Sequence, residues 1–252
     1  MLRKIEINNF KSFEHAEFDL KNFTLLAGRN SMGKTSVIQA IFAMIQNGKN
    51  PFRGEYMNIG KVQEVKNAIT GNGDIEFKIC YKTSEKEIEA SKVITKEGVS
   101  ESGEIDKLIN VIYCSSDRIG IEDTYKKYLG DKIIIGKNCE YVFHHLNAHD
   151  EDQMDPDRDF VYDVESSKLT FGGQVSYWLD RIMGYRVKAR EIEQTEFIQV
   201  LYSNDKVPFE MRPKNVGTGV TYITELFIAA LACKANDLLV IENPEIRLHP
   251  SG

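Results

Sequence analysis

The sequence has 252 residues, of which 42% are hydrophobic, and a formal net charge of −6. It is long enough to bury a globular core, but no apolar run approaches the roughly 20 residues that a membrane-spanning helix requires. Its four cysteines are scattered without a C-x-x-C pair, which argues against a disulfide framework and a zinc site. Because the first residues do not lead into a signal-peptide core, we expect a cytoplasmic protein with no membrane partner.

The negative charge is concentrated in one segment. Residues 150–165 contain eight acidic residues and one arginine, which leaves a net charge of +1 for the rest of the chain. A DNA-facing surface elsewhere is therefore compatible with the composition. We interpret the acidic segment itself as a solvated loop.

The pattern of the first 45 residues predicts three strands followed by a helix. Apolar and polar residues alternate in Leu2–Asn8 and in Ala16–Leu20, which is typical of half-buried strands. The apolar run Phe23–Ala27 then predicts a buried strand, and apolar residues at helical spacing after Lys34 predict a helix.

The segment between this strand and this helix fits the phosphate-binding pattern G-x-x-x-x-G-K-[S/T] at every fixed position. In that pattern the backbone N–H groups of the loop and the helix N-terminus surround phosphate oxygens. We expect Lys34 to reach the β- and γ-phosphates and the Thr35 hydroxyl to coordinate Mg²⁺. A plain glycine-rich turn is the alternative. The predicted nucleotide-binding residues are Gly28, Arg29, Asn30, Ser31, Met32, Gly33, Lys34, Thr35 and Ser36.

The middle of the chain predicts a surface excursion, further strands and a helical region. The excursion is rich in Gly and Asn, and the strands show alternating or short apolar patterns. A polar, helical pattern over residues 125–184 predicts a helical subdomain inserted in the sheet. The predicted elements are the excursion Asn47–Gly60, a weak helix at Val62–Ala68, a hairpin of Asp74–Lys82 with Lys86–Thr95, a strand at Asn110–Cys114, and paired strands at Val187–Ala189 and Phe197–Tyr202.

The last 40 residues carry a second set of candidate functional residues. An apolar helix is predicted to begin near Gly217, Thr218 and Gly219 and to run to about Cys233, and its glycine-rich start is a candidate phosphate contact. A glycine-rich helix start with no ligand is the alternative. The aliphatic run Leu238–Ile241 predicts a buried strand that delivers Glu242, a carboxylate suited to holding the hydration shell of Mg²⁺.

Four blocks of the sequence resemble ATP-binding-cassette-type AAA ATPases of the SMC/RecF group, and within it the compact ATPases related to the OLD family. The blocks are Ile7–Phe13, the phosphate loop, Asn215–Val220, and Ile241–Glu245 with Leu248–Pro250. The resemblance implies an α/β P-loop NTPase with the fold of an ABC-type head, which has a mixed sheet, N-terminal antiparallel strands and a helical insertion. It also implies one domain over residues 1–252, incomplete at its C-terminus.

The same resemblance implies a switch that binds ATP with Mg²⁺, hydrolyses ATP to ADP and phosphate, and acts in DNA repair or anti-phage defence. Two copies would form a homodimer around ATP, with the phosphate loop of one copy facing Gly217–Gly219 of the other. DNA or an effector protein is the expected further partner.

Two departures from the family pattern affect the expected mechanism. Asn243 stands where these ATPases commonly place the glutamate that activates water, and an amide cannot accept a proton, so Glu245 is the alternative base. The sequence also stops at Gly252, where the family continues into a strand with a switch histidine. We therefore expect a fragment, or a second chain that supplies the rest.

Three other functional classes are alternatives to an ATP-hydrolysing switch. A transporter ATPase subunit would carry a Leu-Ser-Gly-Gly-Gln signature, which the sequence lacks. A small-molecule kinase would transfer phosphate to an acceptor, so phosphate release without an acceptor would distinguish it. A nucleotide-sensing interaction module with little turnover remains compatible with Asn243.

Overall fold

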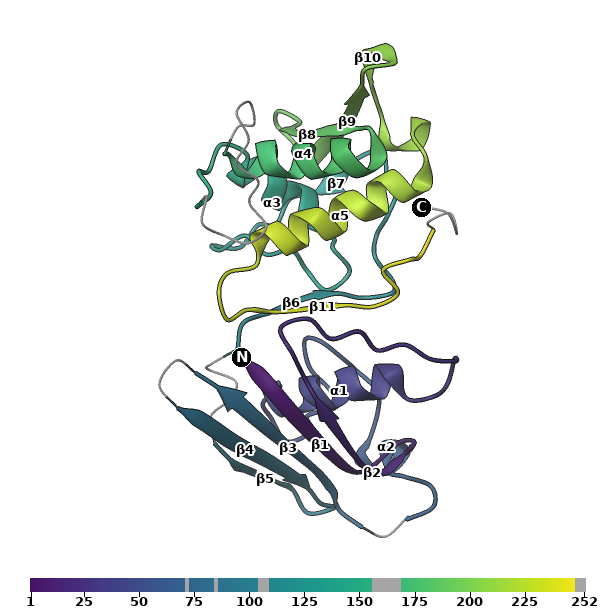
Figure 1. Ribbon diagram of the computed structural model, residues 1–252, viewed down its shortest axis with the longest axis vertical. Helices are drawn as coiled ribbons and strands as arrows, with labels where there is room; N and C mark the ends of the chain where they lie inside the picture. The colour runs from purple at the N-terminus through teal and green to yellow at the C-terminus, as the bar shows by residue number, and fades with distance from the viewer. Residues whose placement is uncertain (71–72, 84–85, 104–108, 156–168, 248–252) are drawn as a thin grey trace. The chain divides into compact units, whose positions relative to one another are not determined.

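The computed structural model describes residues 1–70, 73–83, 86–103, 109–155 and 169–247. The chain folds into two compact units, residues 1–110 and 111–252 (Figure 1). Most of the predicted acidic loop, and the Leu248–Pro250 part of the fourth block, lie outside the described residues.

The first unit is built on an antiparallel sheet of five strands. Its order is β2-β1-β3-β4-β5, and the alternation of apolar residues places Ile5 and Ile7 of β1 with Phe77 of β3 in the core. The predicted N-terminal strands and the predicted hairpin are confirmed, whereas β5 was not predicted. The strands are β1 (Leu2–Phe10), β2 (Phe13–Asp19), β3 (Ile75–Lys82), β4 (Glu87–Ile94) and β5 (Val99–Ser102).

Helix α1 (Lys34–Ile45) packs on this sheet (Figure 1). Its apolar residues from Val37 to Ile45 recur at helical spacing, and most of them are buried. The short helix α2 (Val62–Val65) follows the predicted surface excursion. The side chain of Gln46 closes that excursion, because Nε2 donates to the carbonyl oxygen of Pro51 over 2.8 Å and Oε1 accepts from the backbone N–H of Tyr56 over 2.7 Å.

The predicted buried strand at Phe23–Ala27 is wrong. These residues form neither a helix nor a strand, and the side chains of Phe23 and Leu25 are 82% and 70% exposed. An apolar run specifies a buried strand only when neighbouring strands supply hydrogen bonds on its edges. Within the described residues of the first unit, no strand pairs with this segment.

In its described residues, the second unit contains two small sheets and three α-helices. Strand β6 (Val111–Cys114) pairs in parallel with β11 (Leu238–Ile241). The other sheet has β9 (Phe197–Asn204) paired with β7 (Tyr125–Lys126), β8 (Arg186–Glu191) and β10 (Val207–Met211). The helices are α3 (Val142–His149), α4 (Phe171–Met183) and α5 (Thr218–Ala232), and a 3₁₀ turn at Pro213–Asn215 precedes α5.

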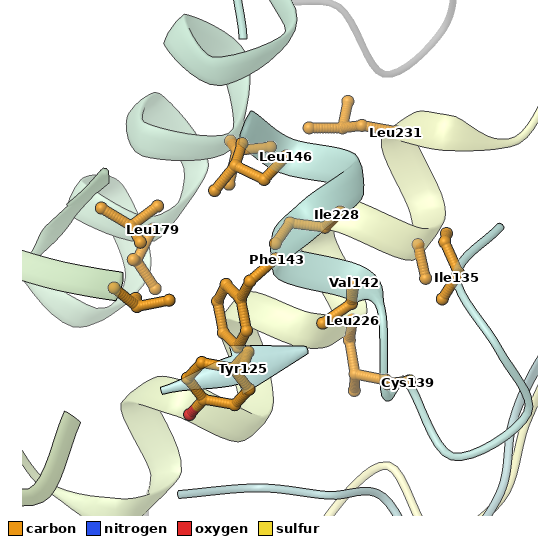
Figure 2. Packing of buried hydrophobic residues seen from close by; sticks show 14 of the residues in the cluster. Tyr125, Ile135, Cys139, Val142, Phe143, Leu146, Leu179, Leu226, Ile228 and Leu231 are labelled. Atoms are coloured by element: carbon orange, nitrogen blue, oxygen red, sulfur yellow. The ribbon is translucent and has the colours of Figure 1, made fainter. Parts of the chain in front are cut away.

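The core of the second unit lies between these helices and the sheet of β7 to β10. Figure 2 shows Phe143 of α3 against Tyr125 of β7, with ring centroids 4.3 Å apart. Leu179 of α4 and Ile228 of α5 complete this cluster. The buried side chains of the described part of residues 125–184 therefore pack in one cluster with those of β9 and α5.

Candidate functional site

The phosphate loop of the first unit leads directly into α1. Gly33 is the N-cap residue of the helix, with a left-handed backbone at φ 92°, a conformation that glycine adopts without steric cost. The Lys34 ammonium donates to the carbonyl oxygens of Gly28 over 2.7 Å and of Arg29 over 2.8 Å. These two bonds hold the ammonium against the backbone of the loop.

The turn between β1 and β2 packs against this loop. A Cβ atom on Gly33 would lie 2.7 Å from the Phe13 ring and 2.8 Å from the Ser12 hydroxyl oxygen, so the turn and the loop are in close contact. Lys11 also donates to the Gln39 side chain of α1 over 2.6 Å. The Ile7–Phe13 block thereby has a physical role, which is to fix the start of α1.

The start of α1 has the features of an anion site. Within the described chain, no side chain caps the helix at Gly33 and its first turn contains no acidic residue. The N–H groups of that turn and the positive end of the helix dipole are therefore open to a phosphate. Thr35 is exposed beside them, whereas Ser36 is buried. The loop residues Arg29, Asn30, Ser31 and Met32 are exposed.

In the second unit, Glu242 extends the pairing of β11 with β6. Its backbone N–H donates to the carbonyl oxygen of Cys114 over 2.9 Å. Its Oε2 accepts from the Tyr113 hydroxyl over 2.8 Å, and burial together with this carboxylate raises the pKa of Tyr113. Its Oε1 is buried and has no hydrogen-bond partner among the described residues.

This orphaned carboxylate oxygen fits the requirement of a magnesium site. Mg²⁺ takes oxygen ligands, and it is usually held by one or two protein side chains together with water and substrate phosphates. Among the described residues, no group of three or more His, Cys, Asp or Glu side chains forms a metal site by itself. Glu242 is thus a single carboxylate at this strand end, which is compatible with a nucleotide-bound Mg²⁺ that takes its other ligands from phosphates and water.

Arg118 organises the backbone at this strand end. Its side chain is fully buried, and Nη1 donates to the carbonyl oxygens of Ser115 over 3.0 Å and of Glu242 over 2.8 Å. Its Nη2 donates to the carbonyl oxygen of Asn243 over 3.0 Å. Arg118 therefore ties the end of β11 to the end of β6.

Asn243 and Glu245 lie in the exposed turn that follows β11. Asn243 has a left-handed backbone at φ 44°, and its carbonyl oxygen accepts from the N–H of Ile246 over 3.1 Å. Both side chains are solvent-exposed. The structure places Asn243 directly beside Glu242 and places Glu245 further along the same turn.

The second glycine-rich segment begins α5, as the sequence predicts. Gly217 is the N-cap residue, Gly217 and Thr218 are exposed, and Gly219 is partly buried. A Cβ atom on Gly217 would meet nothing within 4 Å, and the backbone there is ordinary at φ −59°. The fold of this chain therefore does not itself require glycine at this position.

Sequence reasoning missed two residues of the strand end. Tyr113 sits in an apolar strand, where only its hydroxyl group signals a polar partner. Arg118 lies in the segment that follows β6, and its sequence neighbours carry no local signal of its role. Neither side chain's partner can be found without the pairing of β6 with β11.

Comparisons with known proteins identify the family and the fold of the chain. The AAA ATPase domain family matches residues 1–172. The SMC head domain from Thermotoga maritima is similar in structure with a TM-score of 0.52 at 11% identity, over 99% of this chain and 80% of that chain. Among curated proteins, none matches. The fold class expected from the sequence, an α/β P-loop NTPase, is confirmed, and no helix in the described part of the chain has the length and apolarity to cross a membrane.

Proposed function

The chain belongs to the AAA ATPase domain family, and from this premise we propose that it binds ATP with Mg²⁺ and hydrolyses it slowly to ADP and phosphate. The observation that carries the proposal is the phosphate loop, with the Lys34 ammonium held over it by two carbonyl oxygens. A bound nucleotide would offer its phosphates to that ammonium and to the open N-terminus of α1.

The proposal gives separate roles to the residues that meet Mg²⁺ and phosphate. Lys34 neutralises the β- and γ-phosphates, and Thr35 contributes a hydroxyl ligand to Mg²⁺. Glu242 contributes a carboxylate, which its orphaned Oε1 leaves available. Bound Mg²⁺ would offset the charge that develops on the transferred phosphoryl group.

The identity of the general base decides how fast the reaction runs. Asn243 can orient a water molecule through its amide but cannot take its proton. Glu245 is exposed in the same turn and is the nearest carboxylate that follows Glu242 in sequence. We propose a slow enzyme in which Glu245 gives weak assistance.

We further propose that two copies dimerise around ATP through Gly217, Thr218 and Gly219, and that this switch acts on DNA or an effector protein in DNA repair or anti-phage defence. The exposed start of α5 supports this, because it has no acidic residue in its first turn and open space beside Gly217. A glycine that its own fold does not require is suited to a position where another molecule approaches closely.

The test is nucleotide binding by the Lys34→Ala variant. Removing a charge-assisted contact to phosphate should cost several kcal/mol, so affinity should fall by about a hundredfold or more. Titration with a fluorescent ATP analogue measures it. Lys49→Ala, which removes an exposed lysine beyond the end of α1, is the matched control and should bind normally. Equal affinity in the two variants would refute the site.

Asn243 also supports a second candidate, a nucleotide-sensing module with little turnover. The two functions differ in one measurement, which is phosphate release at saturating ATP and Mg²⁺. Tight binding with no phosphate released above the Lys34→Ala background would favour the sensor.

A further inference from the structure

The Nε atom of Arg118 faces a buried acidic residue of α5. Glu225 is fully buried, and its Oε1 accepts from the backbone N–H of Gly120 over 3.0 Å. Its Oε2 lies 3.9 Å from Nε of Arg118. Neither Nε of Arg118 nor Oε2 of Glu225 has a hydrogen-bond partner among the described residues.

This contact is unlike the other bonds of Arg118. The bonds to the three carbonyl oxygens are 2.8 to 3.0 Å long, whereas a charge-assisted bond between Nε and Oε2 would need a separation of about 2.8 Å. Burial raises the pKa of Glu225 to about 8 against the opposing effect of Arg118, in keeping with a contact that is not a full ion pair. A movement of about 1 Å would close it.

Helix α5 connects this contact to the candidate phosphate-binding start at Gly217–Gly219. Glu225 lies seven residues after Thr218, or about 10 Å along the axis of one continuous helix. Tyr222 lies between them on the same helix, and its ring centroid is 5.8 Å from the guanidinium groups of Arg118 and of Arg247. A shift of α5 therefore changes the surroundings of Arg118.

On its other side Arg118 holds the backbone of the metal-binding strand end. Its donors fix the carbonyl oxygens of Glu242 and Asn243, so a movement of the guanidinium displaces both residues. Catalytic groups are sensitive to such displacements, because a misplacement of about 1 Å can cost a hundredfold in rate.

We propose that Arg118 and Glu225 are positioning residues that transmit the state of the α5 N-terminus to Glu242 and Asn243. When phosphate binds at Gly217–Gly219, α5 shifts, the open contact between Nε and Oε2 closes, and the strand end takes its hydrolytic geometry. This inference rests on the proposed ATPase function and deepens it by assigning the control of turnover to two buried residues.

Two variants change the contact with little change in volume. Arg118→Lys keeps the positive charge but loses the fork that reaches three carbonyl oxygens. Glu225→Gln keeps an acceptor for Gly120 but puts an amide NH2 group in place of Oε2, and that group cannot accept from Nε of Arg118. Both should lower kcat by about tenfold or more, while the KM for ATP and the affinity of the phosphate loop change less than about twofold.

The controls are the same substitutions in an exposed pair of the same unit. Arg190→Lys and Glu210→Gln alter an ion pair of 3.2 Å whose side chains are 53% and 37% exposed, and kcat should not change. The fluorescence of Trp178, the single tryptophan of the sequence, reports folding of the second unit. An unchanged kcat in both Arg118→Lys and Glu225→Gln would overturn the inference, and so would unfolding of both, which would make the pair structural.

A double-mutant cycle tests the transmission itself. If Arg118 relays the state of the helix start, Thr218→Ala and Arg118→Lys should have non-additive effects on kcat. Additive effects would overturn the relay. Phosphate release by the unaltered chain separates the two proposals: its absence refutes the ATPase function, whereas its presence with unaffected variants refutes only the roles of Arg118 and Glu225.

Discussion

Asn243 combines a backbone requirement with a chemical limitation. Its φ of 44° lies in the left-handed region, which asparagine tolerates better than most residues. Its amide, however, cannot serve as a base. Asparagine at this position therefore suits the left-handed backbone of the turn rather than proton transfer. That backbone sets the position of the Asn243 carbonyl oxygen, which accepts a hydrogen bond from Arg118.

We predict that Asn243→Glu raises turnover by about tenfold, which corresponds to roughly 1.4 kcal/mol off the barrier. The carboxylate would stand beside Glu242, where a water-activating base is missing. The left-handed backbone at this position costs about 1 to 2 kcal/mol for a residue such as glutamate, and this cost lowers the stability of the turn rather than the gain in rate. Phosphate release at saturating ATP and Mg²⁺ measures the outcome.

Two further variants show which side chain, Asn243 or Glu245, limits turnover. Asn243→Gly keeps the positive φ and removes only the amide, so it isolates the contribution of the side chain. Glu245→Gln removes the alternative base. If Asn243→Glu gives no gain and Glu245→Gln abolishes hydrolysis, Glu245 is the base and the enzyme is not limited by Asn243.

Helix α3 carries a partly buried, titratable residue at the edge of the core of the second unit. His145 packs against the rings of His149 and Phe171. Burial, aided by the neighbouring histidines, lowers its pKa to about 4. Its folded-state pKa is below the value of about 6.5 for an unfolded chain, so the folded helix keeps His145 neutral where the unfolded chain would protonate it.

The sign of the resulting pH effect follows from this difference. The stability contributed by neutral His145 is present above about pH 6.5 and is lost as the pH falls toward about 4. We predict that the second unit loses about 2 kcal/mol of unfolding free energy between neutral pH and about pH 5 through this residue. Denaturant unfolding followed by Trp178 fluorescence measures it.

His145→Gln should flatten this part of the pH dependence, because glutamine does not titrate. His15→Gln is the matched control, since His15 lies in an exposed position on β2 of the other unit. A pH dependence that persists in His145→Gln would show that other groups cause it.

At the scale of the whole molecule, the proposed dimer depends on space at the start of α5. We predict that Gly217→Trp spares ATP binding by the single chain and blocks ATP-dependent dimerisation. A Cβ atom at Gly217 would meet nothing within 4 Å among the described residues, and the backbone at φ −59° suits any residue, so the substitution should disturb mainly an approaching partner. Size-exclusion chromatography with light scattering, with and without ATP, measures the change in mass.

Gly98→Trp is the control for a bulky residue in open space, because a Cβ atom there also meets nothing within 4 Å. That variant should dimerise with ATP like the unaltered chain. Loss of nucleotide binding in monomeric Gly217→Trp would show that the helix start acts within its own chain.

Local patterns of the sequence predicted most of the fold. Alternation located β1 with β2, β3 with β4 and β8 with β9, because each pair has one buried face and a short connection. Strands β5 and β10 were missed, since both are short and mostly exposed. Strand β7, which has only two residues, lies in the region that was predicted to be helical. The segment Phe23–Ala27 was predicted wrongly because an apolar run does not reveal whether neighbouring strands exist.

The candidate site was predictable only where one short motif contains all of its parts. The phosphate loop and the helix after it lie within about 20 residues, so pattern and context could be read together. The strand end depends on Tyr113 and Arg118, which are more than 100 residues from Glu242 in sequence. Such partners are fixed by the parallel pairing of β6 and β11, which local patterns do not encode.

The closure of the segment after α1 by Gln46 determines where this part of the chain can accept inserted residues. Gln46 anchors both Pro51 and Tyr56, and Asn50 donates to the carbonyl oxygen of Gly60 over 3.1 Å. The ends of this loop are thereby fixed close together, independently of the length of its exposed tip around Arg53. We therefore expect residues inserted at that tip to leave α1 and the phosphate loop in place, because the bonds of Gln46 and Asn50 still fix the ends of the loop.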